Sequence, residues 1–159
     1  MKLGIIGGGN LTSAIVKGAH GKIADIIVSD MDEDKIKKFA SYNIKTTKSN
    51  IDVVLESDFV ILAVKPNHYK QVLNEIKPYY KGKVIITVAP GISIRYVKDI
   101  LGDDAQVIRT GPNTPVMLGE GMTVMAYEEP VSDEVFNEAK KIFDMLGKTM
   151  VLEEYLMDA

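Results

Sequence analysis

The sequence comprises 159 residues, of which 46% are hydrophobic, and its formal net charge is −3 at pH 7. This length suffices for one domain with a sizeable core, and the acidic balance, without a basic block among aromatics, argues against nucleic acid as a partner. The chain has no cysteine, which excludes disulfides and cysteine-based metal sites, and no segment approaches the ~20 apolar residues of a membrane span. We therefore expect a soluble cytoplasmic domain with no membrane partner and no metal site.

The first twenty residues predict a strand, a tight turn and a helix. The apolar run 3–6 stops at three glycines, after which apolar residues recur at helical spacing. Gly7 and Gly9 permit positive φ and the close approach of a pyrophosphate, to which the helix N-terminus offers unpaired N–H groups. The alternative is a structural turn that binds nothing, since Thr12 replaces the third glycine of the Gly-x-Gly-x-x-Gly pattern. An acid about 20 residues later favours a dinucleotide site.

That acid is Asp30, which closes the second expected strand at residues 26–28. A carboxylate at this position accepts hydrogen bonds from an adenosine ribose 2′-hydroxyl and repels a 2′-phosphate, so Asp30 favours NAD over NADP. The alternative is that Asp30 belongs with the acids that open the following helix. Lys35, on the solvated face of that helix, is a cation that can offset the carboxylate by binding a 2′-phosphate.

The remaining chain continues to alternate strands and helices. Further strands are expected at residues 43–46, 59–64, 84–88, 106–109, 122–127 and 148–152. Helices are expected at residues 49–56, 67–77, 93–101 and 132–146. Residues 110–115 are expected to form a stiff turn with two X-Pro bonds, either of which can be cis. The alternation predicts an α/β fold, a Rossmann-like doubly wound and mostly parallel sheet with helices on both faces, in a single domain.

Three motifs carry a resemblance to a known family. They are Gly7-Gly8-Gly9-Asn10, then Ala63-Val64-Lys65-Pro66, then Pro112-Asn113-Thr114-Pro115 with Gly119-x-Gly121-Met122-Thr123 after it. In this order and spacing they resemble the N-terminal domain of pyrroline-5-carboxylate reductase. The resemblance implies hydride transfer from a nicotinamide cofactor to the C=N bond of 1-pyrroline-5-carboxylate, giving L-proline. Family members usually use NADP, whereas Asp30 argues for NAD.

The resemblance also implies a set of site residues. The pyrophosphate would lie at residues 6–11, the adenosine portion at Asn50, the dinucleotide path along residues 63–66, and the nicotinamide beside residues 88–91. The cofactor-binding residues are thus expected to be Ile6, Gly7, Gly8, Gly9, Asn10, Leu11, Asp30, Asn50, Ala63, Val64, Lys65, Pro66, Val88, Ala89 and Gly91. Asn113 and Thr114 are the substrate-side candidates, and no catalytic residue is identified. Arg109 matches a family arginine, although an ion pair at a strand end explains it equally well.

Two substitutions and the length depart from the family pattern. Gly111 replaces a methionine and Pro90 an alanine. Family members continue into a helical domain that dimerises and supplies most of the substrate pocket. We therefore expect a cofactor domain at residues 1–152, a connection to that domain at 153–159, and an inactive chain that forms no homo-oligomer without it. The alternatives are a free-standing dinucleotide-binding module without turnover, and the cofactor domain of an enzyme like the β-hydroxyacid dehydrogenases.

Overall fold

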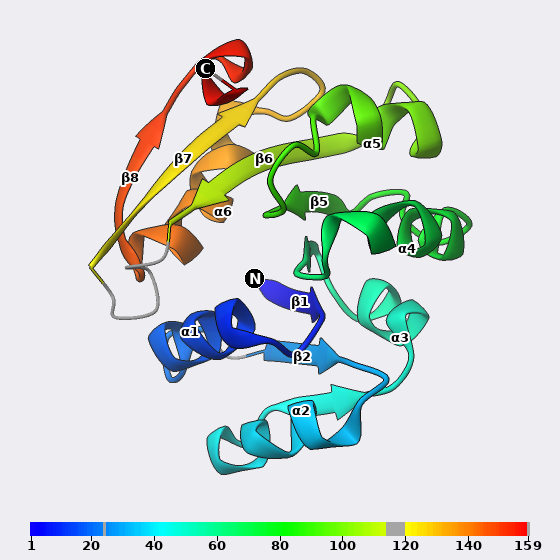
Figure 1. Ribbon diagram of the computed structural model, residues 1–159, viewed down its shortest axis with the longest axis vertical. Coiled ribbons are helices and arrows are strands. Elements are labelled where there is room, and N and C mark those ends of the chain that lie inside the picture. Colours follow the sequence, from blue (N-terminus) through cyan, green and yellow to red (C-terminus); the bar gives the residue numbers. More distant parts are fainter. Residues whose placement is uncertain (24, 114–119, 159) are drawn as a thin grey trace.

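The computed structural model describes residues 1–23, 25–113 and 120–158, which form a central eight-stranded sheet with helices on both faces (Figure 1). The strands are β1 (Lys2–Ile6), β2 (Asp25–Ser29), β3 (Lys45–Thr47), β4 (Phe59–Leu62), β5 (Val84–Thr87), β6 (Gln106–Pro112), β7 (Gly121–Tyr127) and β8 (Gly147–Val151). The α-helices are α1 (Asn10–Ala19), α2 (Glu33–Lys37), α3 (Asn50–Leu55), α4 (Tyr69–Ile76), α5 (Ile94–Leu101) and α6 (Asp133–Asp144). The 3₁₀ helices among the described residues are η1 (Lys38–Tyr42), η2 (Pro66–His68) and η4 (Glu154–Asp158).

The strand order is β3-β2-β1-β4-β5-β6-β7-β8. Strands β1 to β6 pair in parallel, whereas β7 is antiparallel to β6 and β8 is parallel to β7. The first six strands thus have the 3-2-1-4-5-6 order of a doubly wound fold. In this fold, successive strands are added on one side of β1 as far as β3 and then on its other side from β4 onward, so the strand order reverses between β1 and β4. The predicted Rossmann-like, mostly parallel sheet is confirmed. Ligands of such sheets bind outside the carboxyl ends of the strands at this reversal.

Two apolar layers hold the helices to the sheet. Helices α1 and α6, together with α2 and η1, cover one face, and α3, α4 and α5 cover the other (Figure 1). In β4, Ile61 faces the first layer while Val60 and Leu62 face the second, and none of the three is exposed to solvent. Burial on both faces explains why this strand reads as an unbroken apolar run. Each such side chain stabilises the fold by about 1.5–3 kcal/mol.

The structure corrects the expected turn at residues 110–115. Thr110, Gly111 and Pro112 continue β6, because they pair with β7 in an antiparallel ladder. Among the described residues the cis X-Pro bond precedes Pro130, and the bond before Pro112 is not cis. The second proline of the expected turn, Pro115, lies outside the described residues.

The other boundaries differ by a few residues. The helix expected at 67–77 begins as η2 and becomes α4, and the helix after Asp32 is split into α2 and η1. The short helix at 49–56 is capped by Ser49, which accepts from the Asp52 N–H. In the described part of the chain, no helix has the length and apolar character needed to cross a membrane.

Candidate cofactor site at the glycine turn

The turn between β1 and α1 begins at Gly7, whose φ of +109° lies in the region that favours glycine. Its N–H donates to the Ser29 carbonyl oxygen over 2.8 Å. A Cβ at this position would lie 2.4 Å from the Ala63 carbonyl oxygen, a distance at which the backbone would have to shift. Gly7 is therefore required by the fold itself, since it lets the turn pack against the segment that follows β4.

Gly9 is different, because the fold does not require a glycine there. Its φ of −80° and ψ of −161° are extended backbone angles open to any residue, and a Cβ built on it meets no atom within 4 Å. Gly9 is the N-cap of α1 and is followed by Asn10 and Leu11, of which Asn10 is exposed and Leu11 half-buried. The first N–H groups of a helix have no partner within it and attract anions. The absence of a side chain at Gly9 thus leaves open space beside an anion-attracting helix end.

Asp30 lies against the same turn. Its Oδ2 accepts from the Gly8 N–H over 2.8 Å and its Oδ1 from the Asp32 N–H over 2.9 Å. The carboxylate therefore supports the glycine turn, a role that the sequence pattern does not reveal. Each carboxylate oxygen accepts more than one hydrogen bond, so these contacts leave acceptor capacity for a hydroxyl group. Lys35 also lies close, since a Cβ at Gly8 would be 3.4 Å from the Lys35 Cβ.

Thr12, at the third position of the glycine pattern, is fully buried. Its hydroxyl donates to the Gly7 carbonyl oxygen and so closes the turn from the helix side. The hydrogen of this hydroxyl is therefore used within the turn and is not available to donate to a ligand. Thr12 replaces the close packing of a third glycine with a hydrogen bond.

The segment after β4 lies on the other side of the glycine turn. The Ala63 N–H donates to the Ile6 carbonyl oxygen over 2.8 Å, so this segment lies beside the turn. Ala63 and Val64 are half-buried, whereas Lys65 and Pro66 are exposed. The structure therefore brings residues 6–8 and 63–64 together at the carboxyl ends of β1 and β4.

The segment after β5 lies one strand further along the same edge. Val88 is half-buried, Ala89 is buried, and Gly91 has a φ of +76°. The Val88 N–H donates to the hydroxyl of Tyr69 over 3.2 Å, and that hydroxyl donates to the Leu62 carbonyl oxygen. Tyr69 is a residue that the sequence reasoning missed, because an aromatic side chain at the start of a helix reads as core.

Asn50, the first residue of α3, also lies at this edge. Its Oδ1 accepts from the Ser29 hydroxyl over 2.7 Å, and its Nδ2 donates to Glu75 Oε1 over 2.8 Å. These two contacts fix the side-chain amide between the carboxyl end of β2 and helix α4. The amide thus lies near the carboxyl end of β2, beside Ser29.

Arg109 forms the ion pair that was the alternative explanation for it. Its guanidinium is buried, with the residue 4% exposed, and it donates to Glu154 over 3.2 Å and to Asp158 over 3.0 Å. Glu154 also accepts from the Ile94 N–H over 2.8 Å, so it caps α5. Hydrogen bonding to Asp158 raises the pKa of Arg109 and lowers that of the carboxyl. The charge of Arg109 is thereby used to attach η4 to the sheet.

The two substrate-side candidates have different outcomes. Asn113 follows β6, and its Oδ1 accepts from the Met122 N–H over 2.9 Å, while its backbone N–H donates to the Met122 carbonyl oxygen over 3.3 Å. The side chain is exposed but its oxygen is used within the hairpin. Thr114 lies outside the described residues.

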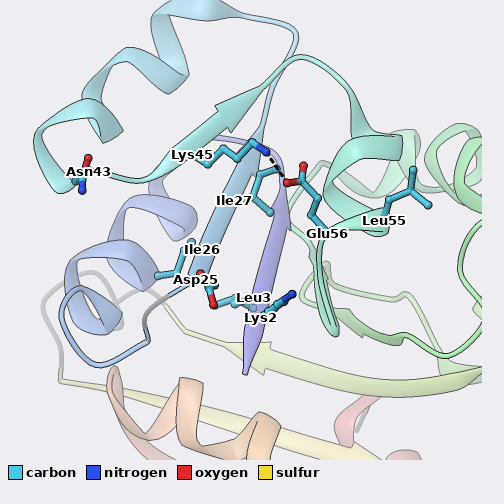
Figure 2. Close-up of a pocket in the computed structure, with 9 residues that line it drawn as sticks. All are labelled: Lys2, Leu3, Asp25, Ile26, Ile27, Asn43, Lys45, Leu55 and Glu56. Atoms are coloured by element: carbon cyan, nitrogen blue, oxygen red, sulfur yellow. Dashed lines mark hydrogen bonds and ion pairs between the residues drawn. The ribbon is translucent and has the colours of Figure 1, made fainter.

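A cavity of about 410 Å³ lies elsewhere, at the amino ends of β1 and β2 (Figure 2). The residues that line it are Lys2, Leu3, Asp25, Ile26, Ile27, Asn43, Lys45, Leu55 and Glu56. Lys45 and Glu56 form an ion pair across it (Figure 2). None of the expected cofactor-binding residues lines this cavity, because they lie at the opposite ends of the strands.

The strand order, the two helical layers and the glycine turn define a Rossmann-like α/β domain of the doubly wound class. A family described as NADP oxidoreductase, coenzyme F420-dependent, matches residues 2–91. The chain belongs to this family. The matched part runs from β1 through the segment after β5 and so contains every expected cofactor-binding residue.

Individual relatives are pyrroline-5-carboxylate reductases. The enzyme of Haemophilus influenzae is 30% identical over 152 residues, which are 93% of this chain and 56% of that protein. The solved reductase of Coxiella burnetii superposes with a TM-score of 0.91 at 30% identity, covering 96% of this chain and 58% of that one. The Plasmodium falciparum reductase, solved with NADP bound, has a TM-score of 0.88 at 26% identity, covering 99% and 60%. The chain therefore spans little more than half the length of these relatives, and the resemblance seen in its motifs is confirmed.

Proposed function

We propose that this chain is the cofactor-binding part of a pyrroline-5-carboxylate reductase and that it binds NAD(P)H at the glycine turn. The open space at Gly9 carries the proposal, because neither backbone strain nor packing accounts for a glycine there. A pyrophosphate needs that space to reach the first N–H groups of α1. A relative solved with NADP bound supports the choice of ligand class.

In the proposed complex the cofactor lies across the carboxyl ends of β1, β2, β4 and β5. Residues 6–11 hold the pyrophosphate, Asp30 and Asn50 face the adenosine portion, and residues 63–66 with Val88, Ala89 and Gly91 line the path to the nicotinamide. When bound, the nicotinamide supplies the hydride for the C=N bond of the substrate. The residues of this chain bind and orient the nicotinamide. This orientation brings its C4 within reach of the imine carbon of the substrate.

The substrate needs two further contacts, an anchor for its carboxylate and a hydrogen bond to its imine nitrogen. We assign Asn113 and Thr114 to the anchor. Asn113 can donate to the carboxylate with its amide N–H₂ group while its Oδ1 continues to accept from the Met122 N–H. The proton for the imine nitrogen is assigned to the helical domain that the resemblance implies, and dimerisation belongs to that domain as well. A cytoplasmic location stays a prediction of the sequence.

The proposed cofactor preference follows from the two charged groups beside the turn. The Asp30 carboxylate accepts from Gly8 and repels a 2′-phosphate, whereas Lys35 attracts one. Because the carboxylate is held in place by two hydrogen bonds and the lysine amine is on a flexible exposed stem, the carboxylate has the larger effect. We propose that NADH binds at least as tightly as NADPH.

Two experiments test the function. Titration of the chain with NADH and with NADPH measures the affinity for each cofactor. If neither cofactor binds, the dinucleotide site is refuted. Cofactor deuterated at the nicotinamide C4 is then incubated with 1-pyrroline-5-carboxylate and the chain fused to the helical domain of a relative. Deuterium in the proline product is the expected result. Binding without transfer in the fused protein would instead indicate a binding module without turnover.

A further inference from the structure

Tyr69 links the two strands whose ends line the nicotinamide half of the proposed site. It is the first residue of α4 and is fully buried. Its hydroxyl donates to the carbonyl oxygen of Leu62, the last residue of β4, and accepts from the N–H of Val88, the first residue after β5. One hydroxyl group thus joins two segments that are far apart in the sequence.

The bridge lies where the pairing of these strands ends. The last paired residues of β4 and β5 are Leu62 and Thr87. Beyond them, the two segments of the chain leave the sheet. Backbone N–H and C=O groups at such a point need a partner other than the neighbouring strand. The Tyr69 hydroxyl is that partner for the Leu62 carbonyl oxygen and for the Val88 N–H. It thereby fixes the distance between the points at which residues 63–66 and 88–91 begin.

The hydroxyl is a permanent donor at neutral pH. Burial raises the pKa of Tyr69 to about 12, and the hydrogen bonds to the backbone of Val88 and Ala89 oppose this only in part. The proton therefore stays on the oxygen and the bond to Leu62 persists throughout the physiological range. The protonation state of this hydroxyl therefore does not change with pH over that range.

We propose that Tyr69 is a positioning residue for the nicotinamide half of the cofactor, acting through the spacing of residues 63–66 and 88–91. This inference rests on the proposed dinucleotide site. The adenosine half is positioned separately, because Asp30 and Asn50 hold the ends of β1 and β2 through contacts that do not involve Tyr69. Loss of the Tyr69 hydroxyl should therefore affect the two halves of the ligand unequally.

The test compares Tyr69→Phe with Tyr80→Phe. Tyr80 is a matched control, since it is also buried and its hydroxyl also donates to a carbonyl oxygen, that of Leu101 over 2.8 Å. It lies near the amino end of β5, at the opposite end of that strand from Val88. Each variant is titrated with NADPH and with ADP, which has the adenosine and the pyrophosphate of NADPH but neither its 2′-phosphate nor its nicotinamide. Thermal unfolding sets a temperature at which all proteins are folded.

For Tyr69→Phe we expect the Kd of NADPH to rise about tenfold, the factor that corresponds to about 1.4 kcal/mol. The Kd of ADP should stay that of the original chain, and Tyr80→Phe should change neither. A merely structural hydroxyl would lower stability in both variants and leave the ratio of the two Kd values unchanged. Equal weakening of NADPH and ADP, or NADPH binding unchanged in Tyr69→Phe, would overturn the inference.

A measurement on the unmodified chain covers the case in which Tyr69→Phe fails to fold. Exchange of the Val88 amide hydrogen is followed with NADPH and with ADP. We expect NADPH to slow this exchange and ADP to leave it as it is, whereas equal rates with both would overturn the inference. Failure of the original chain to bind NADPH or ADP would refute the proposed site itself, which is a distinct result.

Discussion

Substitution of Gly9 by alanine separates what the fold needs from what a ligand needs. The added methyl group meets no atom within 4 Å, and the backbone angles of Gly9 are open to alanine. Loss of glycine at an N-cap costs about 0.5–1 kcal/mol, and the stiffer unfolded chain recovers about 0.4–1 kcal/mol. The free energy of unfolding should therefore change little.

The affinity of the Gly9→Ala variant for NADPH should change much more than its stability. The methyl group occupies the space through which a pyrophosphate approaches the N-terminus of α1. Loss of one charge-assisted hydrogen bond costs about 1.5–3 kcal/mol, which is about a tenfold to 150-fold rise in Kd. Calorimetric titration of the Gly9→Ala variant with NADPH measures this rise, and urea unfolding provides the stability control. A variant that is stable and binds NADPH with unchanged affinity would refute the reasoning.

Three further predictions concern other parts of the turn and the attached C-terminal segment. Gly7→Ala should lose about 3 kcal/mol of stability in urea unfolding, since it combines a strained positive φ with a backbone clash; a loss below about 1 kcal/mol would contradict this. Asp30→Asn removes the charge beside Gly8 and should shift the ratio of the NADPH and NADH Kd values about tenfold towards NADPH; an unchanged ratio would show that this carboxylate does not select the cofactor. Arg109 holds the pKa of Asp158 below its ordinary value of 3.8. The ion pair between them therefore contributes its full stability above about pH 3.8 and loses it as the pH falls through the lowered pKa. Asp158→Asn should remove this part of the acid dependence of the melting temperature, and the same acid dependence in both proteins would count against the ion pair.

The fold was predictable because its signals are local. The unbroken apolar run at residues 59–62 and the glycine turn before an amphipathic helix both follow from the burial of a parallel strand and the geometry of a helix start. The boundaries near Pro112 were not predictable. Its strand continues because β7, the next strand along the chain, pairs with it, and no pattern within residues 110–112 encodes that pairing.

The positions of the site residues were predictable in part. The carboxyl ends of parallel strands meet at one edge, so the glycine turn, Asp30 and Ala63 had to lie near one another. Their hydrogen-bond partners were not predictable, because each bond spans many residues. The carboxylate of Asp30 supports Gly8, and the guanidinium of Arg109 is taken by Asp158, far along the chain. Periodicity tells which face of a strand is buried but not which polar groups pair across elements.

In the proposed complex, the open space at Gly9 admits the pyrophosphate of the dinucleotide. A crystal structure of the chain with NADPH would show where the pyrophosphate lies. We expect phosphate oxygens within hydrogen-bond distance of the backbone N–H groups at the start of α1, with the nicotinamide directed towards Val88. A pyrophosphate bound elsewhere, such as in the cavity at the amino ends of β1 and β2, would contradict it.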